Sequence, residues 1–229
     1  MVKNFSFATT AVLSIFLAGL LFSVSRLNFQ TRTEEKKNFI APSAKIQNFT
    51  FGYKDLVTDF LWIRVIQDFD FCSSEIKTAN PYKVCVNKSW LFKYLDVITI
   101  LSPSFRMPYA TGALALTVLI TDIEGASVIF DRGTLEFPTD WPILYRAAYH
   151  AIIEEKNFKK AAHLLIQAQK NGGPDWLVGL AGRMLVKSGE LEMAKSLINH
   201  LNETGTKDQA NVYAERIQKR IQEYTKNQQ

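Results

Sequence analysis

The sequence predicts an all-α protein in which an apolar N-terminal helix precedes a series of packed helix pairs. After residue 48, apolar side chains recur three and four positions apart, and no stretch alternates apolar and polar residues for long enough to form a sheet. The 229 residues are 47% hydrophobic and 21% charged, with 11 Gly and 7 Pro. This composition excludes collagen-like, low-complexity and wholly disordered chains, and the length suits one or two domains.

The charge and the metal-binding residue types exclude two further classes of protein. The net charge of +5 is small and dispersed, whereas nucleic-acid binding requires a basic stripe. Two cysteines and three histidines are too few for a Cys-rich structural zinc site with any redundancy. We therefore expect no nucleic-acid partner, no metal and no cofactor.

Residues 1–25 are predicted to form a transmembrane anchor. The 22 residues between Lys3 and Arg26 carry no charge, and Phe5 to Val24 is mostly apolar. A helix of about 20 residues rises about 30 Å, which matches the hydrocarbon core of a bilayer. A cleaved signal peptide is the main alternative, although the apolar stretch is long for one and no Ala-x-Ala follows it. A buried helix of a soluble domain is the third reading.

Residues 26–48 are polar and charged and are predicted to be a linker. Lys3 stands before the apolar segment, and four basic residues follow it: Arg26, Arg32, Lys36 and Lys37. Taken alone, this distribution would keep the remaining chain in the cytoplasm. A short N-terminal tail before the anchor is nevertheless usual for an exported, signal-anchored protein, so the orientation depends on the cysteines.

Cys72 and Cys85 flank a segment that reads as a loop around the turn signal Asn80-Pro81. A disulfide between them would close this loop and stabilise the fold by roughly 3 kcal/mol in the chain-entropy model. Such a bond persists in an oxidising compartment, and it favours a periplasmic or other extracytoplasmic location. Two unrelated thiols are the alternative, and the lack of Cys-x-x-Cys argues against a redox catalyst.

Residues 49–106 are predicted to form a first helical pair with the cysteine loop inserted between its helices. In the first helix, Leu56, Phe60 and Ile63 share one helical stripe, and a second stripe runs beside it (Val57, Leu61 and Val65). Two stripes make a broad apolar face, which we expect to be mostly buried; a position on the membrane surface is the alternative. The second helix spans Ser89 to Leu101 and ends at Ser102-Pro103.

Residues 107–201 contain the clearest internal similarity. Helices are predicted from Tyr109 to Ile120, from Ile123 to Leu135 and from Trp141 to Glu155. Asp140-Trp141 corresponds to Asp175-Trp176. Three small residues, Ala126, Ala161 and Ala194, recur 35 and 33 residues apart.

This spacing resembles the tetratricopeptide repeat (TPR), whose period is 34 residues and whose unit is helix–turn–helix. The resemblance places the three alanines where helices A and B of each unit cross most closely. Gly133 and Ala168 match the family's next small position, and Leu201 departs from it. The resemblance implies a TPR-like α-solenoid across residues 107–201, with residues 49–106 as a divergent first pair. A generic helical bundle is the alternative.

Residues 202–229 are predicted to cap the array. Within a final helix from Asp208 to Lys226, an apolar stripe faces inward (Tyr213, Ile217, Ile221 and Tyr224), and charged residues face outward (Glu215, Arg216, Lys219 and Glu223). A solenoid exposes an apolar face at its last repeat, which an amphipathic helix covers.

The TPR resemblance also implies a concave binding surface lined by the A helices. The family's groove positions fall on Arg146, His150, Trp176 and Arg183. Guanidinium groups there suit an acidic segment or a free C-terminal carboxylate. His150 stands where the chaperone-binding subgroup has Asn, which departs from that subgroup's carboxylate clamp. The alternative is that these are solvated surface charges.

No catalytic motif is present: there is no glycine-rich phosphate loop, no Gly-x-Ser-x-Gly and no His-Glu-x-x-His. We therefore expect a non-enzymatic, membrane-anchored scaffold or adaptor that binds a protein partner in a bacterial envelope complex. One alternative is a cytoplasm-facing assembly factor for a membrane complex. Another is an exported thiol-dependent or ligand-binding protein that uses Cys72 and Cys85.

Overall fold

The computed structural model describes residues 17–20, 22–23, 45–46, 50–67, 89–204 and 207–227. The chain separates into two compact units, residues 1–40 and 41–229. Most of the predicted anchor lies outside the described residues, as do nearly all of the predicted linker and both Cys72 and Cys85. Within the described parts, no helix combines the length and the apolar character needed to span a bilayer.

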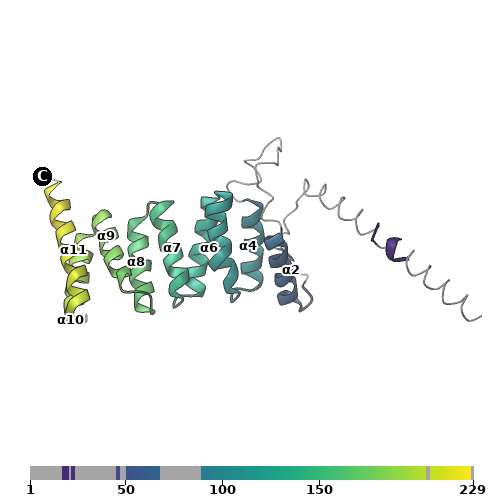
Figure 1. The fold of residues 1–229 in the computed structure, drawn as a ribbon, viewed down its shortest axis with the longest axis horizontal. Helices are drawn as coiled ribbons and strands as arrows, with labels where there is room; N and C mark the ends of the chain where they lie inside the picture. Colours follow the sequence, from purple (N-terminus) through teal and green to yellow (C-terminus); the bar gives the residue numbers. More distant parts are fainter. Residues whose placement is uncertain are drawn as a thin grey trace, which may run out of the picture. The chain divides into compact units, whose positions relative to one another are not determined.

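Every regular element of the described chain in the second unit is helical, so the predicted all-α class is confirmed. The chain follows the order α2 (Lys54–Gln67), α4 (Trp90–Leu101), η4 (Pro108–Gly112), α5 (Ala113–Ala115), η5 (Leu116–Ile120), α6 (Ile123–Glu136), α7 (Trp141–Ile153), α8 (Phe158–Lys170), α9 (Trp176–Lys187), α10 (Leu191–Thr204) and α11 (Lys207–Lys226). Neighbours in the sequence are also neighbours in space, from α2 in blue to α11 in yellow (Figure 1).

Side-chain caps explain where several of these helices begin. Asp122, Asp140 and Asn157 each precede a helix, and each side chain accepts a hydrogen bond from the backbone N–H three residues later. Ser89 does the same for α4 through Phe92. Such caps satisfy N–H groups that have no partner within the helix.

Small residues allow the helices to approach closely. A Cβ atom at Gly133 of α6 would lie 2.9 Å from the Tyr109 Cβ of η4, and one at Gly112 would lie 2.7 Å from Leu95 of α4. Successive helices pack in the pairs α2 with α4, α6 with α7, α7 with α8, and α8 with α9. The core consists mainly of Leu, Ile and Ala side chains on these facing surfaces.

The three alanines occupy equivalent places in their helices. Ala126, Ala161 and Ala194 are each the fourth residue of their helix (α6, α8 and α10) and each is fully buried. The backbone N–H of each donates to the carbonyl of the residue just before its helix, at 2.9–3.0 Å. These three helices therefore begin with the same local geometry.

The turns that lead into these helices also share a backbone feature. Thr121, Lys156 and Gly189 have φ values of 58°, 55° and 81°, and each stands two residues before α6, α8 or α10 begins. Left-handed backbone favours glycine, because other residues place Cβ too close to the carbonyl oxygen. Only one of the three turns uses glycine, so the sequence does not display this feature.

The helix predicted from Tyr109 to Ile120 is not a regular α-helix. Two π-helical turns, η4 and η5, flank the single α-helical turn α5. In η5 the N–H of Thr121 donates to the Leu116 carbonyl, five residues back. A π-helical turn contains about one residue more than an α-helical turn. Helix η5 ends at Ile120, directly before the left-handed Thr121.

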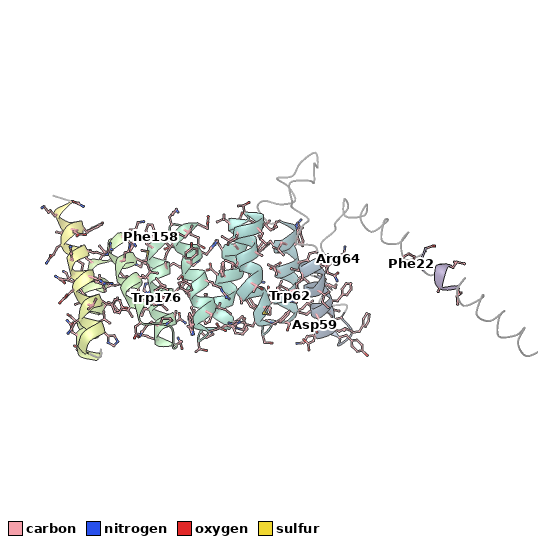
Figure 2. All side chains as sticks on the ribbon, in the orientation of Figure 1. Phe22, Asp59, Trp62, Arg64, Phe158 and Trp176 are labelled. Carbon is pink, nitrogen blue, oxygen red and sulfur yellow. The ribbon has the colours of Figure 1, made fainter. Side chains whose placement is uncertain are left out.

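Helix α2 differs from the prediction in what it buries. Leu61 and Val65 are buried as expected, but the neighbouring stripe is open to solvent: Leu56, Phe60 and Ile63 are 67%, 64% and 52% exposed. The expectation that both stripes are mostly buried is therefore wrong. Only one side of α2 faces α4. At the edge of that side, Trp62 (labelled in Figure 2) meets Phe105 edge-to-face, with ring centroids 5.7 Å apart.

Candidate functional site

A cleft between α9 and α11 gathers positive charge and aromatic rings. It has a volume of about 280 Å³. Its lining from α9 is Trp176, Gly179, Leu180 and Arg183, and its lining from α11 is Tyr213, Arg216, Ile217 and Arg220. The cleft is thus formed by the last helix of the chain and the first helix of the preceding pair.

Two glycines of α9, one of which lines the cleft, let α11 approach closely. A Cβ atom at Gly179 would lie 2.8 Å from Tyr213 Cδ1, and one at Gly182 would lie 2.3 Å from Ile217 Cδ1. Side chains at these positions would push α11 away from α9. The buried Ile217 side chain fills the space that the absent Cβ leaves, which fixes the α11 arginines relative to α9.

The cleft is cationic. Arg183, Arg216 and Arg220 are all exposed, and no acidic side chain lines the cleft with them. In the described part of the chain, none of these three guanidinium groups has an ion-pair or hydrogen-bond partner. Arg216 and Arg220 are also four residues apart on one helix, where like charges destabilise by about 0.2–0.5 kcal/mol.

Trp176 provides the apolar wall at the mouth of this cleft. It is the first residue of α9 and is 45% exposed. Its ring meets Tyr145 of α7 edge-to-face, with ring centroids 5.5 Å apart (Trp176 is labelled in Figure 2). The contact holds the indole in place while one part of it remains open to a ligand.

The structure brings together two of the four residues predicted for a partner-binding groove. Trp176 and Arg183 line the cleft, and Arg146 and His150 do not. The Arg146 guanidinium is half-buried and donates a hydrogen bond of 3.1 Å to the Ala110 carbonyl. That bond ties α7 to η4.

His150 lies in the interior and not on an open surface, which corrects its predicted place. It is 2% exposed. Its Nδ1 lies 3.0 Å from the Thr117 hydroxyl and its Nε2 lies 2.9 Å from the Ser127 hydroxyl. Burial lowers the pKa of His150 below its ordinary value, because desolvation disfavours the charged ring. A neutral imidazole suits this site, since it donates to one hydroxyl and accepts from the other.

Arg216 and Arg220 were missed by the sequence prediction. Arg216 was assigned to the solvent face of a capping helix, and Arg220 was not singled out. A signal for both existed in the sequence: the two arginines are four residues apart, and each stands directly before an apolar position, Ile217 or Ile221. Residues beside an inner stripe lie at the edge of the packed face, where they can line a cleft.

A second and larger cleft lies between α10 and α11, with a volume of about 730 Å³. Its polar lining consists mostly of amides (Asn202, Asn211, Gln218 and Gln222), together with Glu215 and Lys219. Opposite charges and neutral amides give it no excess of either sign. Its chemistry does not select an ion, in contrast to the cleft that holds the three arginines.

Other kinds of site have less support in the described residues. That part of the chain holds no group of three or more His, Cys, Asp or Glu side chains placed to bind a metal ion. The predicted disulfide between Cys72 and Cys85 falls outside it. The chain matches no protein-family model, no curated protein and no solved structure.

Proposed function

We propose that this chain is a non-enzymatic scaffold of TPR-like helix pairs, anchored in a membrane by its N-terminal segment, which binds an acidic segment or free C-terminus of a partner protein. The observation that carries the proposal is the cleft between α9 and α11. Three arginines without partners in the described chain share it with Trp176 and Tyr213.

The chemistry of the cleft favours a carboxylate over other anions of peptide origin. A guanidinium group presents a planar fork of donors that matches a carboxylate through two parallel hydrogen bonds. Trp176, Tyr213 and Leu180 offer apolar surface for the side chain next to that carboxylate. The volume lies near the lower end for ligand sites, about 300–1,000 Å³, and suits the end of a chain better than a long segment.

The TPR-like architecture is supported by the recurrence of local geometry. Equivalent alanines and left-handed turns open or precede α6, α8 and α10, and the side chains of Asp122 and Asn157 cap α6 and α8. Stacked helix pairs of this kind present extended surfaces for binding other proteins. A membrane anchor on such a scaffold raises the local concentration of the bound partner at the bilayer, without any additional contact.

A peptide array tests the proposed ligand. Acidic peptides with free C-terminal carboxylates, and the same peptides amidated, are probed with the wild-type protein and with an Arg216→Glu, Arg220→Glu variant. We expect the wild type to select free carboxylates and the variant to lose at least tenfold in binding. Lys219→Glu is the matched control, because it reverses a charge on the same helix but lines the other cleft. Equal losses in both variants would refute the cleft as the site.

For the location, we propose a single-pass membrane protein with most of the chain in the periplasm. The runner-up is a cytoplasm-facing assembly factor, which the basic residues after the apolar segment favour. Alkylation of Cys72 and Cys85 in intact cells, with and without reductant, separates them. Thiols that react only after reduction support the periplasmic location, and thiols that react without reductant support the runner-up.

A further inference from the structure

Helix α2 carries an exposed apolar stripe that the proposed function does not use. We define the outer stripe as Leu56, Phe60 and Ile63, which lie on the side of α2 opposite the buried Thr58, Leu61 and Val65. Phe51 and Tyr53, just before the helix, are 86% and 68% exposed and add apolar surface next to it in the sequence. Soluble proteins expose single apolar side chains commonly but contiguous groups of this size rarely, and such groups mark interaction sites.

Helix α11, at the other end of the same series of helices, has a polar exposed side. Helix α11 buries Ala214, Ile217 and Ile221 and exposes mainly charged and amide side chains. A terminal helix with a polar outer side is what a helical array requires in water. Helix α2 is apolar on both sides, so its outer stripe is suited to a non-aqueous neighbour.

The position of α2 in the chain indicates which neighbour. The predicted anchor ends about 30 residues before Leu56. In residues 26–54 between them, six basic residues (Arg26, Arg32, Lys36, Lys37, Lys45 and Lys54) stand against Glu34 and Glu35. Such an excess is attracted to anionic lipid headgroups, and aromatic residues such as Phe51 and Tyr53 suit the boundary between headgroups and acyl chains.

We propose that the outer stripe of α2 inserts into the interface of the bilayer that carries the anchor, so that α2 lies flat on the membrane. This inference rests on the proposed anchor. Within α2 the charges balance, with Lys54 and Arg64 against Asp55 and Asp59, so the helix itself is not repelled by an anionic surface. A second copy of the chain is a poorer neighbour, because pairing through α2 would bring two basic segments together.

Site-specific photo-crosslinking tests this contact in the full-length chain. The photoreactive residue p-benzoylphenylalanine replaces Phe60 in one variant and Leu135 in a control. Leu135 lies on α6 and is 80% exposed. Both variants are reconstituted into vesicles of phosphatidylethanolamine and phosphatidylglycerol and irradiated. Mass spectrometry then measures the yield of lipid adducts. We expect a lipid adduct at position 60, several-fold above position 135, and a several-fold lower yield when phosphatidylcholine replaces phosphatidylglycerol.

Two results would overturn the inference. An adduct of twice the chain mass at position 60 would assign the stripe to a second copy, and equal lipid labelling at positions 60 and 135 would show no preferred contact. Flotation of the same vesicles after carbonate treatment distinguishes failure of the α2 contact from failure of the proposed anchor. A chain that floats but gives no lipid adduct at position 60 retains its anchor and refutes only the α2 contact. A chain that does not float refutes both.

Discussion

Asp122 joins two helices through one buried carboxylate. Its Oδ1 accepts a hydrogen bond of 2.9 Å from the Gly125 N–H and so caps α6, and its Oδ2 accepts one of 2.7 Å from the Ser89 N–H at the start of α4. The residue is fully buried. Gly125 is required beside it, because a Cβ there would lie 2.7 Å from the carboxylate. The first packed layers after α2 therefore depend on this side chain.

We expect Asp122→Ala to lower the free energy of unfolding by about 2–4 kcal/mol, since it removes a cap and leaves a buried N–H without an acceptor. Glu124→Ala, at an exposed position in the same turn, should change the stability by less than about 0.5 kcal/mol. Urea denaturation followed by circular dichroism measures both. Equal effects of the two substitutions would show that the buried hydrogen bonds of Asp122 do not stabilise the fold.

His150 makes the stability of the fold depend on pH. Because burial lowers its pKa in the folded state, the unfolded chain binds a proton at a higher pH than the folded chain does. Stability should therefore fall as the pH drops below about 6.5, the ordinary histidine pKa. Glu155 lies 3.8 Å from the ring, and the Glu155 pKa is also lowered, because hydrogen bonds from Ser127 and Lys160 outweigh its burial. That carboxylate affects stability only at more acidic pH.

The test compares wild type with His150→Gln by thermal unfolding between pH 7 and pH 5. Gln retains a donor and an acceptor for Thr117 and Ser127 but does not titrate. We expect the wild-type melting temperature to fall over this range and the variant to fall distinctly less. Parallel curves for the two proteins would mean that His150 is not the titrating group.

The left-handed turns before α6, α8 and α10 are the element-scale feature most open to experiment. Gly189→Ala should destabilise by about 1 kcal/mol, because it forces Cβ into a left-handed conformation. Thr121→Gly at the equivalent turn should act in the opposite direction and stabilise by about 0.5–1 kcal/mol. Chemical denaturation of both variants gives the two signs, and two changes of the same sign would contradict the equivalence of the turns.

Five helices were predicted with stated bounds from residue 89 onward (89–101, 109–120, 123–135, 141–155 and 208–226), and these bounds agree with the structure to within two residues because their signals are local. Asp, Asn and Ser caps begin helices, and Pro103 and Pro138 follow helix ends. The turns could not be predicted in the same way, since Thr121 and Lys156 hold a conformation that their residue types do not favour. The π-helical turns could not be predicted for a related reason, because hydrogen bonds to the fifth residue back have no distinct pattern of side chains.

Whether a residue lies inside or outside depended on neighbours that spacing does not reveal. Both stripes of α2 were identified, but only the packing of α4 decides which one is buried. The TPR resemblance placed His150 on an open groove, yet hydroxyls from Thr117 and Ser127 enclose it. The same resemblance implied Trp176 and Arg183, whereas Arg216 reaches their cleft only through the packing of α11.

At the scale of the whole molecule, the two ends of the helix series differ in the tasks proposed for them. Helix α2, nearest in sequence to the predicted anchor, carries the outer stripe, and α11 completes a cationic cleft. The helices between them repeat a local geometry, and under the proposed function they would connect the two ends rigidly. The central claim is that the cleft recognises a carboxylate.

A double-mutant cycle tests that claim most directly. The acidic peptide that binds best on the array, with a free carboxylate and with an amide, is titrated by calorimetry into wild type and into an Arg216→Gln, Arg220→Gln variant. If the arginines hold the carboxylate, amidation should weaken binding to wild type at least about tenfold and binding to the variant by less than about twofold. An equal effect of amidation on both proteins would contradict the account.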